Sequence, residues 1–130
     1  MNSVSDKIEL TLPFKAEYVS VARLVASGVC NRIGFDIETI EDIKVAISEV
    51  CSKIVSIGSK TADNYTIVYD ITENALNVVY VCDDPSIKCI FDEEKDGLAI
   101  SIITALMDSV VLCDKSNRII SMSKVLEGNR

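Results

Sequence analysis

The strongest constraint on the fold is one long segment, residues 37–57, whose apolar residues recur at helical spacing. Asp36 precedes the segment and Gly58 follows it, and these residue types are typical of the two ends of a helix. The apolar positions form a single stripe, made of Ile40, Ile43, Ile47, Val50, Cys51 and Ile54. Because such a stripe has to be buried, the chain must supply a second layer of structure for this helix to cover.

The rest of the chain supplies that layer. Strands are expected at 7–12, 65–71, 76–82, 110–113 and 119–125, and further helices at 17–32 and 97–107. For the 17–32 helix, the apolar stripe is expected to comprise Val21, Leu24, Val25, Gly28 and Val29, with Gly34 at its end. The order of elements predicts an α+β fold in one domain, 1–130: a two-layer sandwich, with three helices covering one face of a mainly antiparallel sheet.

Composition excludes several classes of function. The chain has 13 lysines and arginines against 20 aspartates and glutamates, a net charge of −7, which argues against nucleic acid or an anionic membrane as a partner. It contains no histidine, which excludes a Ser-His-Asp triad and a histidine-bound metal, and no metal site is expected. The five cysteines include no CxxC pair, and we expect free thiols in the reducing cytoplasm. No targeting or membrane-spanning segment is expected.

Glu49 and Lys53 stand out on the 37–57 helix because they are four residues apart and share one face. As a surface ion pair they would contribute only about 0.3–0.5 kcal/mol. The alternative is that Glu49 is aimed into a pocket.

The segment EYVSVARLVASGVCNRIGFDIETIEDIKVAISEVCSK closely resembles the first two helices of the bacterial anti-sigma factor kinases, the RsbW and SpoIIAB group. These proteins have the histidine-kinase-like (GHKL) ATPase fold, and the likeness extends through ITALMDSV to IISMSKVL. The resemblance implies a homodimer that sequesters a sigma factor in stress response or sporulation. It also implies ATP in a glycine-lidded pocket and phosphorylation of a serine on an anti-anti-sigma (STAS-type) protein.

The same resemblance implies roles for individual residues. Glu49 matches the family's catalytic base, and Lys53, Asp83 and Gly97 stand at its nucleotide-binding positions. Arg23 matches an arginine that the family uses to contact its partner proteins.

The nucleotide positions depart from the family pattern. Lys53 replaces an asparagine that binds magnesium, and an ammonium has donors only. The family has a glycine shortly after the aspartate that Asp83 matches. In this chain Asp83-Asp84-Pro85 has Pro85 in its place, and proline has a fixed φ and no N–H. Asp96 and Ala99 replace glycines beside Gly97, and Ile119 replaces a threonine near the adenine. The lid segment between Asp84 and Asp96 contains no glycine.

These departures predict a degenerate, vestigial site that does not bind ATP and magnesium in the family manner and binds nucleotide weakly or not at all. The leading hypothesis is therefore an anti-sigma factor, regulated by partner switching with an anti-anti-sigma protein, whose kinase activity is lost. One alternative is an active serine kinase with a rebuilt site, in which Lys53 contacts phosphate and ATP and magnesium are cofactors. A second alternative is a dimeric protein-binding scaffold that binds no sigma factor.

Overall fold

The computed structural model describes residues 5–87, 89–112 and 118–127, and the predicted order of elements is confirmed. The strands are β1 (Asp6–Pro13), β2 (Asn64–Ile71), β3 (Ala75–Val81), β4 (Ser109–Leu112) and β5 (Arg118–Val125). The helices are α1 (Val19–Ile33), α2 (Ile37–Ile57) and α3 (Gly97–Leu106), with a short 3-10 turn, η1 (Ala16–Tyr18), before α1. The predicted turn at 114–118 and Cys113 lie almost wholly outside the described residues.

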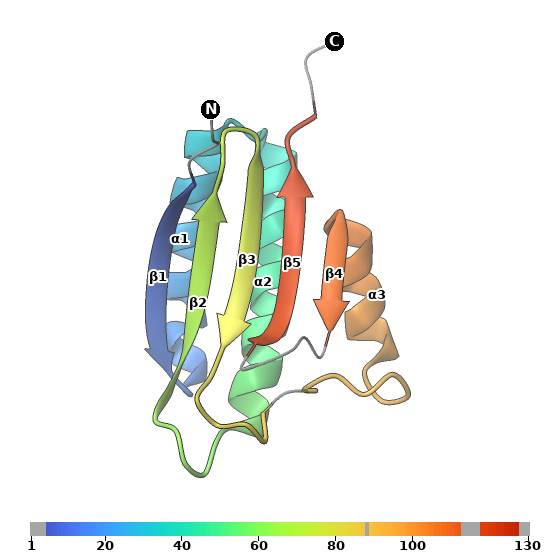
Figure 1. Cartoon of the computed structure of the whole chain (residues 1–130). Helices are drawn as coiled ribbons and strands as arrows, with labels where there is room; N and C mark the ends of the chain where they lie inside the picture. Colours follow the sequence, from blue (N-terminus) through green and yellow to red (C-terminus); the bar gives the residue numbers. More distant parts are fainter. Residues whose placement is uncertain (1–4, 88, 113–117, 128–130) are drawn as a thin grey trace.

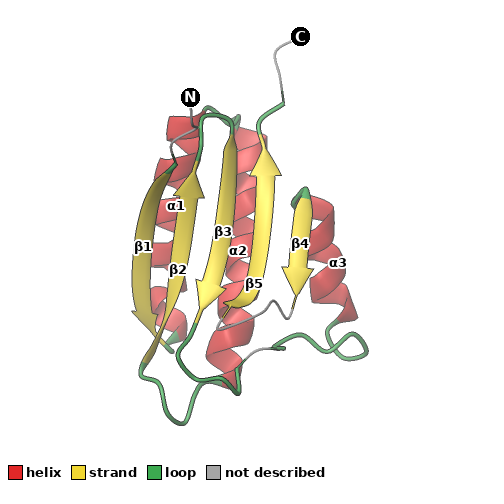
Figure 2. Ribbon diagram, in the orientation of Figure 1, coloured by secondary structure: helices red, strands yellow, loops and turns green. Residues whose placement is uncertain are grey.

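The five strands form one sheet in the order β1-β2-β3-β5-β4, and every pairing is antiparallel. All three helices lie on the same face of this sheet, as Figures 1 and 2 show. The predicted α+β sandwich is confirmed. No helix in the described part of the chain combines the length and the apolarity that crossing a bilayer requires.

The ends of α2 follow the predicted signals. The Asp36 carboxylate accepts a hydrogen bond of 2.8 Å from the Thr39 N–H, which caps the helix. Gly58 ends the helix with φ of 68°, a backbone angle that favours glycine. Between these ends the predicted stripe is buried from Ile43 to Ile54.

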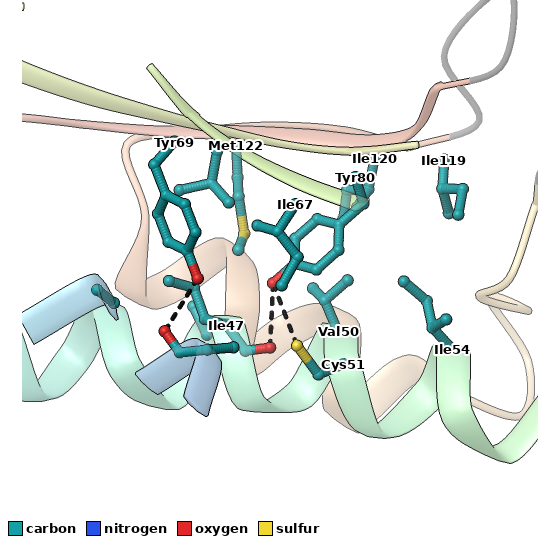
Figure 3. Packing of buried hydrophobic residues seen from close by; sticks show 14 of the residues in the cluster. Ile47, Val50, Cys51, Ile54, Ile67, Tyr69, Tyr80, Ile119, Ile120 and Met122 are labelled. Carbon is teal, nitrogen blue, oxygen red and sulfur yellow. Dashed lines mark hydrogen bonds between the residues drawn. The ribbon is translucent and has the colours of Figure 1, made fainter. Parts of the chain in front are cut away.

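Two tyrosine side chains join the sheet to the helices. The Tyr69 hydroxyl donates a hydrogen bond of 2.9 Å to the Ala22 carbonyl of α1. The Tyr80 hydroxyl donates one of 3.2 Å to the Ile47 carbonyl of α2 (Figure 3). Because buried hydroxyls are stabilised only when they are paired, these bonds fix how each helix sits on the sheet.

The predicted buried face of α1 is wrong in part. Leu24, expected in the core, is 71% exposed. The residues that are buried are Val19, Ala22, Ala26, Val29 and Cys30. Most of these are small, so the helix packs through a narrow face that lets the backbone come close to its neighbours. Val21 and Val25 are only partly buried and pack at the margin of the core.

The cysteines divide into two groups. Cys30, Cys51 and Cys82 are free and buried, as predicted. Burial raises the pKa of the Cys30 thiol to about 12, which suppresses the reactive thiolate. Cys89, however, is disulfide-bonded, so the expectation of a free thiol there is wrong. Cys113 lies outside the described residues.

Candidate functional site

The structure places Lys53 in an ion pair, but not with the predicted partner. Its ammonium lies 3.0 Å and 3.1 Å from the two carboxylate oxygens of Asp96. The side chains are 27% and 17% exposed, so the pair is largely covered. The predicted pair between Glu49 and Lys53 is wrong, because Asp96 at the start of α3 offers Lys53 both of its oxygens. Glu49 itself is half-buried on α2.

Asp96 is held from two sides. Its Oδ2 also accepts a hydrogen bond of 2.8 Å from the Asp92 N–H, and its own N–H donates one of 2.7 Å to the Asp92 carbonyl. The bond from the Asp92 N–H, followed by the bond from Lys53, lowers the Asp96 pKa. The side chain does not cap α3. The carboxylate therefore serves to tie the turn at 92–96 to α2.

Gly97, the first residue of α3, has no structural need to be glycine. A Cβ at this position would meet nothing within 4 Å, and its φ is not positive. The backbone here is an ordinary start of a helix, without a close approach that only glycine permits.

We therefore expect Gly97→Ala to stabilise the protein by about 0.5 kcal/mol, because alanine loses less backbone freedom on folding. A urea denaturation curve of the variant beside wild type measures the difference. A clear loss of stability would show that the position has a constraint that its surroundings do not reveal.

Of the two aspartates after β3, Asp84 has a more structured environment than Asp83, the residue that the sequence indicated. Asp83 is exposed, whereas Asp84 is only 6% exposed. The Ser59 hydroxyl donates to Asp84 Oδ2 at 2.6 Å, and the N–H and hydroxyl of Ser86 donate to Oδ1 at 2.9 Å and 2.7 Å. These bonds lower the Asp84 pKa from 3.8 to about 2.

Asp84 thus ties the α2–β2 loop to the start of the lid segment. The Ser59 hydroxyl extends the network, since its oxygen accepts hydrogen bonds from the N–H groups of Thr61 and Ala62. A pocket of about 680 Å³ opens beside this network at the C-terminal end of α2. It is lined by Asp84 and Ser86 rather than by Glu49 and Lys53. In the sequence only Ser86 lies close to Asp84, whereas Ser59 is 25 residues away, so local spacing could not indicate this arrangement.

The lid segment, described at 85–87 and 89–96, is packed into the protein's own core. Ile87, Ile90 and Phe91 are 5%, 5% and 8% exposed and belong to the main hydrophobic cluster. Ile119 is also buried in this cluster.

Arg23 lies on α1 and is partly buried. Its guanidinium donates a hydrogen bond of 3.2 Å to the Ser48 hydroxyl of α2. Of the other sequence-predicted site residues, Lys53 and Gly97 lie at the contact between α2 and α3, and Asp83 lies exposed after β3. Arg23 lies apart from them, between α1 and α2.

The residues at the nucleotide positions do not fit a magnesium-bound nucleotide. Magnesium requires oxygen ligands, and Lys53 offers an ammonium that is engaged with Asp96. Phosphates are negatively charged, and the Asp96 carboxylate lies directly before the first turn of α3, where it would repel them. We therefore expect Lys53 and Asp96 to stabilise the fold as an ion pair and not to bind a nucleotide.

Comparisons with known proteins agree with the fold. A model of the histidine kinase-like ATPase domain matches residues 12–124. The serine-protein kinase RsbW of Halalkalibacterium halodurans is 29% identical, over 94% of this chain and 85% of its own length. RsbW proteins of Bacillus thuringiensis and Bacillus cereus are each 32% identical, over 94% of this chain and 86% of their own. The chain therefore belongs to the histidine kinase-like ATPase family and, within it, to the group of the serine-protein kinase RsbW.

Proposed function

We propose that this protein is an anti-sigma factor that has lost its kinase activity. In this proposal it sequesters a sigma factor and releases it when an anti-anti-sigma protein of the STAS type binds instead. Membership of the RsbW group supports the sigma and partner-switching roles. The observation that carries the loss of kinase activity is the Lys53–Asp96 ion pair, which joins two positions that would have to receive magnesium and phosphate.

The ion pair also weighs against an active kinase with a rebuilt site. In that alternative the Lys53 ammonium contacts phosphate directly, but here it faces both oxygens of Asp96. A phosphate would have to displace one carboxylate and approach the other carboxylates of the turn at 92–96.

Mixing the purified protein with the sigma factors of its own organism, without nucleotide, tests the sigma role. Absence of binding to every one would favour the scaffold alternative.

Arg23 is proposed to contact the partner. Arg23→Ala is expected to weaken sigma-factor binding about 5- to 150-fold, because it removes a charged donor from an interface. The same change breaks the hydrogen bond to Ser48, which could disturb the helix packing. Ser48→Ala is the matched control, since it removes that bond and keeps the guanidinium. Isothermal titration of both variants separates the two effects: equal losses would assign Arg23 a structural role only.

We further propose that the chain acts as one domain that forms a homodimer in the cytoplasm. Sedimentation equilibrium at micromolar concentration is expected to give twice the 14.2 kDa mass of the chain. A mass that stays at that of the single chain would contradict the dimer, and it would leave the sigma-binding proposal to be judged by its own experiment.

A further inference from the structure

We propose that the lid segment is a built-in clamp that stays closed without nucleotide. In this role the chain's own side chains, rather than a bound ligand, fix α3 against α2. The clamp has three parts: a carboxylate anchor at each end of the lid and an apolar plug between them. All three rest on the described residues 84–87 and 89–96.

The first anchor is Asp84. Three donors from Ser59 and Ser86 converge on its two oxygens, at 2.6–2.9 Å. Ser59 belongs to the loop that follows α2, so this anchor fixes the start of the lid to the C-terminal end of that helix. Because the carboxylate is nearly fully covered, releasing it would leave it and its donors to find water partners.

The second anchor is the Lys53–Asp96 ion pair. Lys53 lies on α2, and Asp96 immediately precedes α3. Asp96 Oδ2 also accepts a hydrogen bond from the Asp92 N–H, and Asp92 Oδ1 accepts one of 2.8 Å from the Glu94 N–H. The end of the lid is thereby a compact turn, and Lys53 attaches that turn to α2.

The plug consists of Ile87, Ile90 and Phe91. These side chains are buried in the same cluster as the stripe of α2 and the inner face of the sheet. A lid that opens and closes over a ligand cannot be held by buried apolar contacts of this kind, because each opening would expose those side chains to water, which is unfavourable. Here opening would expose all three.

The consequence is a fixed relation between α2 and α3. In the proposed anti-sigma function, partner binding would then be indifferent to ATP and ADP. This consequence rests on the proposed function, whereas the closed lid does not. The two can therefore be tested by separate readouts.

Hydrogen exchange by mass spectrometry tests the clamp on the full chain. We expect amides of the lid and of α3 to be protected in wild type without nucleotide, and ATP with magnesium to add no protection. Reductant is present throughout, so that the disulfide of Cys89 does not hold the lid. Lys53→Met is expected to speed exchange of the lid amides about tenfold, while the amides of β1–β3 keep their rates.

Two further variants make this result specific. Lys44→Met is the matched control: Lys44 is also on α2, 26% exposed, and 3.0 Å from a carboxylate, that of Glu41 within the same helix. It should leave lid exchange unchanged. The exchanged pair Lys53→Asp with Asp96→Lys should recover only part of the lost protection, because it restores opposite charges but removes the oxygen that accepts the Asp92 N–H.

Fast lid exchange in wild type that ATP with magnesium slows would overturn the clamp and indicate a working nucleotide lid. Equal effects of Lys53→Met and Lys44→Met would overturn the second anchor. The second readout is the affinity for a sigma factor that the protein binds, measured by titration with and without ATP. A protected lid without sigma binding would contradict the proposed function alone, and sigma binding with an unprotected lid would contradict the clamp alone.

Discussion

Replacing Ile47 by alanine is expected to lower the free energy of unfolding by about 3 kcal/mol. Ile47 is fully buried at the centre of α2, where the helix faces the tyrosines of the sheet (Figure 3). The change removes three carbon atoms from a close-packed region that cannot collapse around the gap. It keeps the Ile47 carbonyl that accepts the Tyr80 hydroxyl, so the effect isolates side-chain packing.

Urea denaturation followed by circular dichroism measures this loss. Val45→Ala is the control on the same helix, since Val45 is 45% exposed and should change the stability by less than about 0.5 kcal/mol. The contrast matters because a domain of this size is stable by only about 5–15 kcal/mol. Similar losses for the two variants would mean that the apolar stripe of α2 is not the centre of the core.

The elements that sequence predicted well are those with one unambiguous periodicity. In α2 the large apolar residues recur on a single face, and its capping residues stand directly at its ends. The α1 helix shows the opposite case. Valine, leucine and alanine occur around most of its circumference, so more than one face looked apolar, and the small residues were the ones buried. Which face is buried then depends on how closely the helix approaches its neighbours, and this is a tertiary property.

The candidate site was predictable in position but not in its contacts. The spacing of Glu49 and Lys53 predicted an ion pair within one helix, because only local neighbours can be read from spacing. The actual partner, Asp96, is 43 residues away in the chain. The sequence indicates Asp83, which matches the family position, whereas the burial of Asp84 depends on serines from two separate loops. In the lid, Ile87, Ile90 and Phe91 were visible as apolar residues, but a connecting segment gave no periodicity to place them.

The largest effect we expect is in phosphotransfer. With the same anti-anti-sigma substrate, the wild-type chain is expected to transfer phosphate from ATP at less than about one-thousandth of the rate of the Bacillus cereus RsbW relative. Removing one group that stabilises charge in a transition state already reduces a rate about 10²–10³-fold. By resemblance to the family, Lys53 corresponds to the metal-binding position and Asp96 to a glycine beside the phosphates, and in this chain the two side chains form an ion pair.

Lys53→Asn alone is not expected to restore the reaction. It supplies an amide oxygen at the metal position, but Asp96 then loses its partner and keeps its negative charge beside the start of α3. Pro85 still lacks an N–H, and the lid still has no glycine between Asp84 and Asp96. The double change Lys53→Asn with Asp96→Gly removes the charge as well. We expect it to remain inactive, because Ile87, Ile90 and Phe91 of the lid are still buried in the core.

A radiolabelled ATP assay with excess substrate protein measures these rates, with the Bacillus cereus relative as positive control. Glu49→Gln is included in the wild-type background, because any genuine activity through the family's base would disappear with it. Phosphotransfer by wild type that Glu49→Gln abolishes would overturn the degenerate-kinase proposal and establish the rebuilt site. Activity that appears only in the double variant would instead show that the Lys53–Asp96 ion pair alone had closed an otherwise intact site.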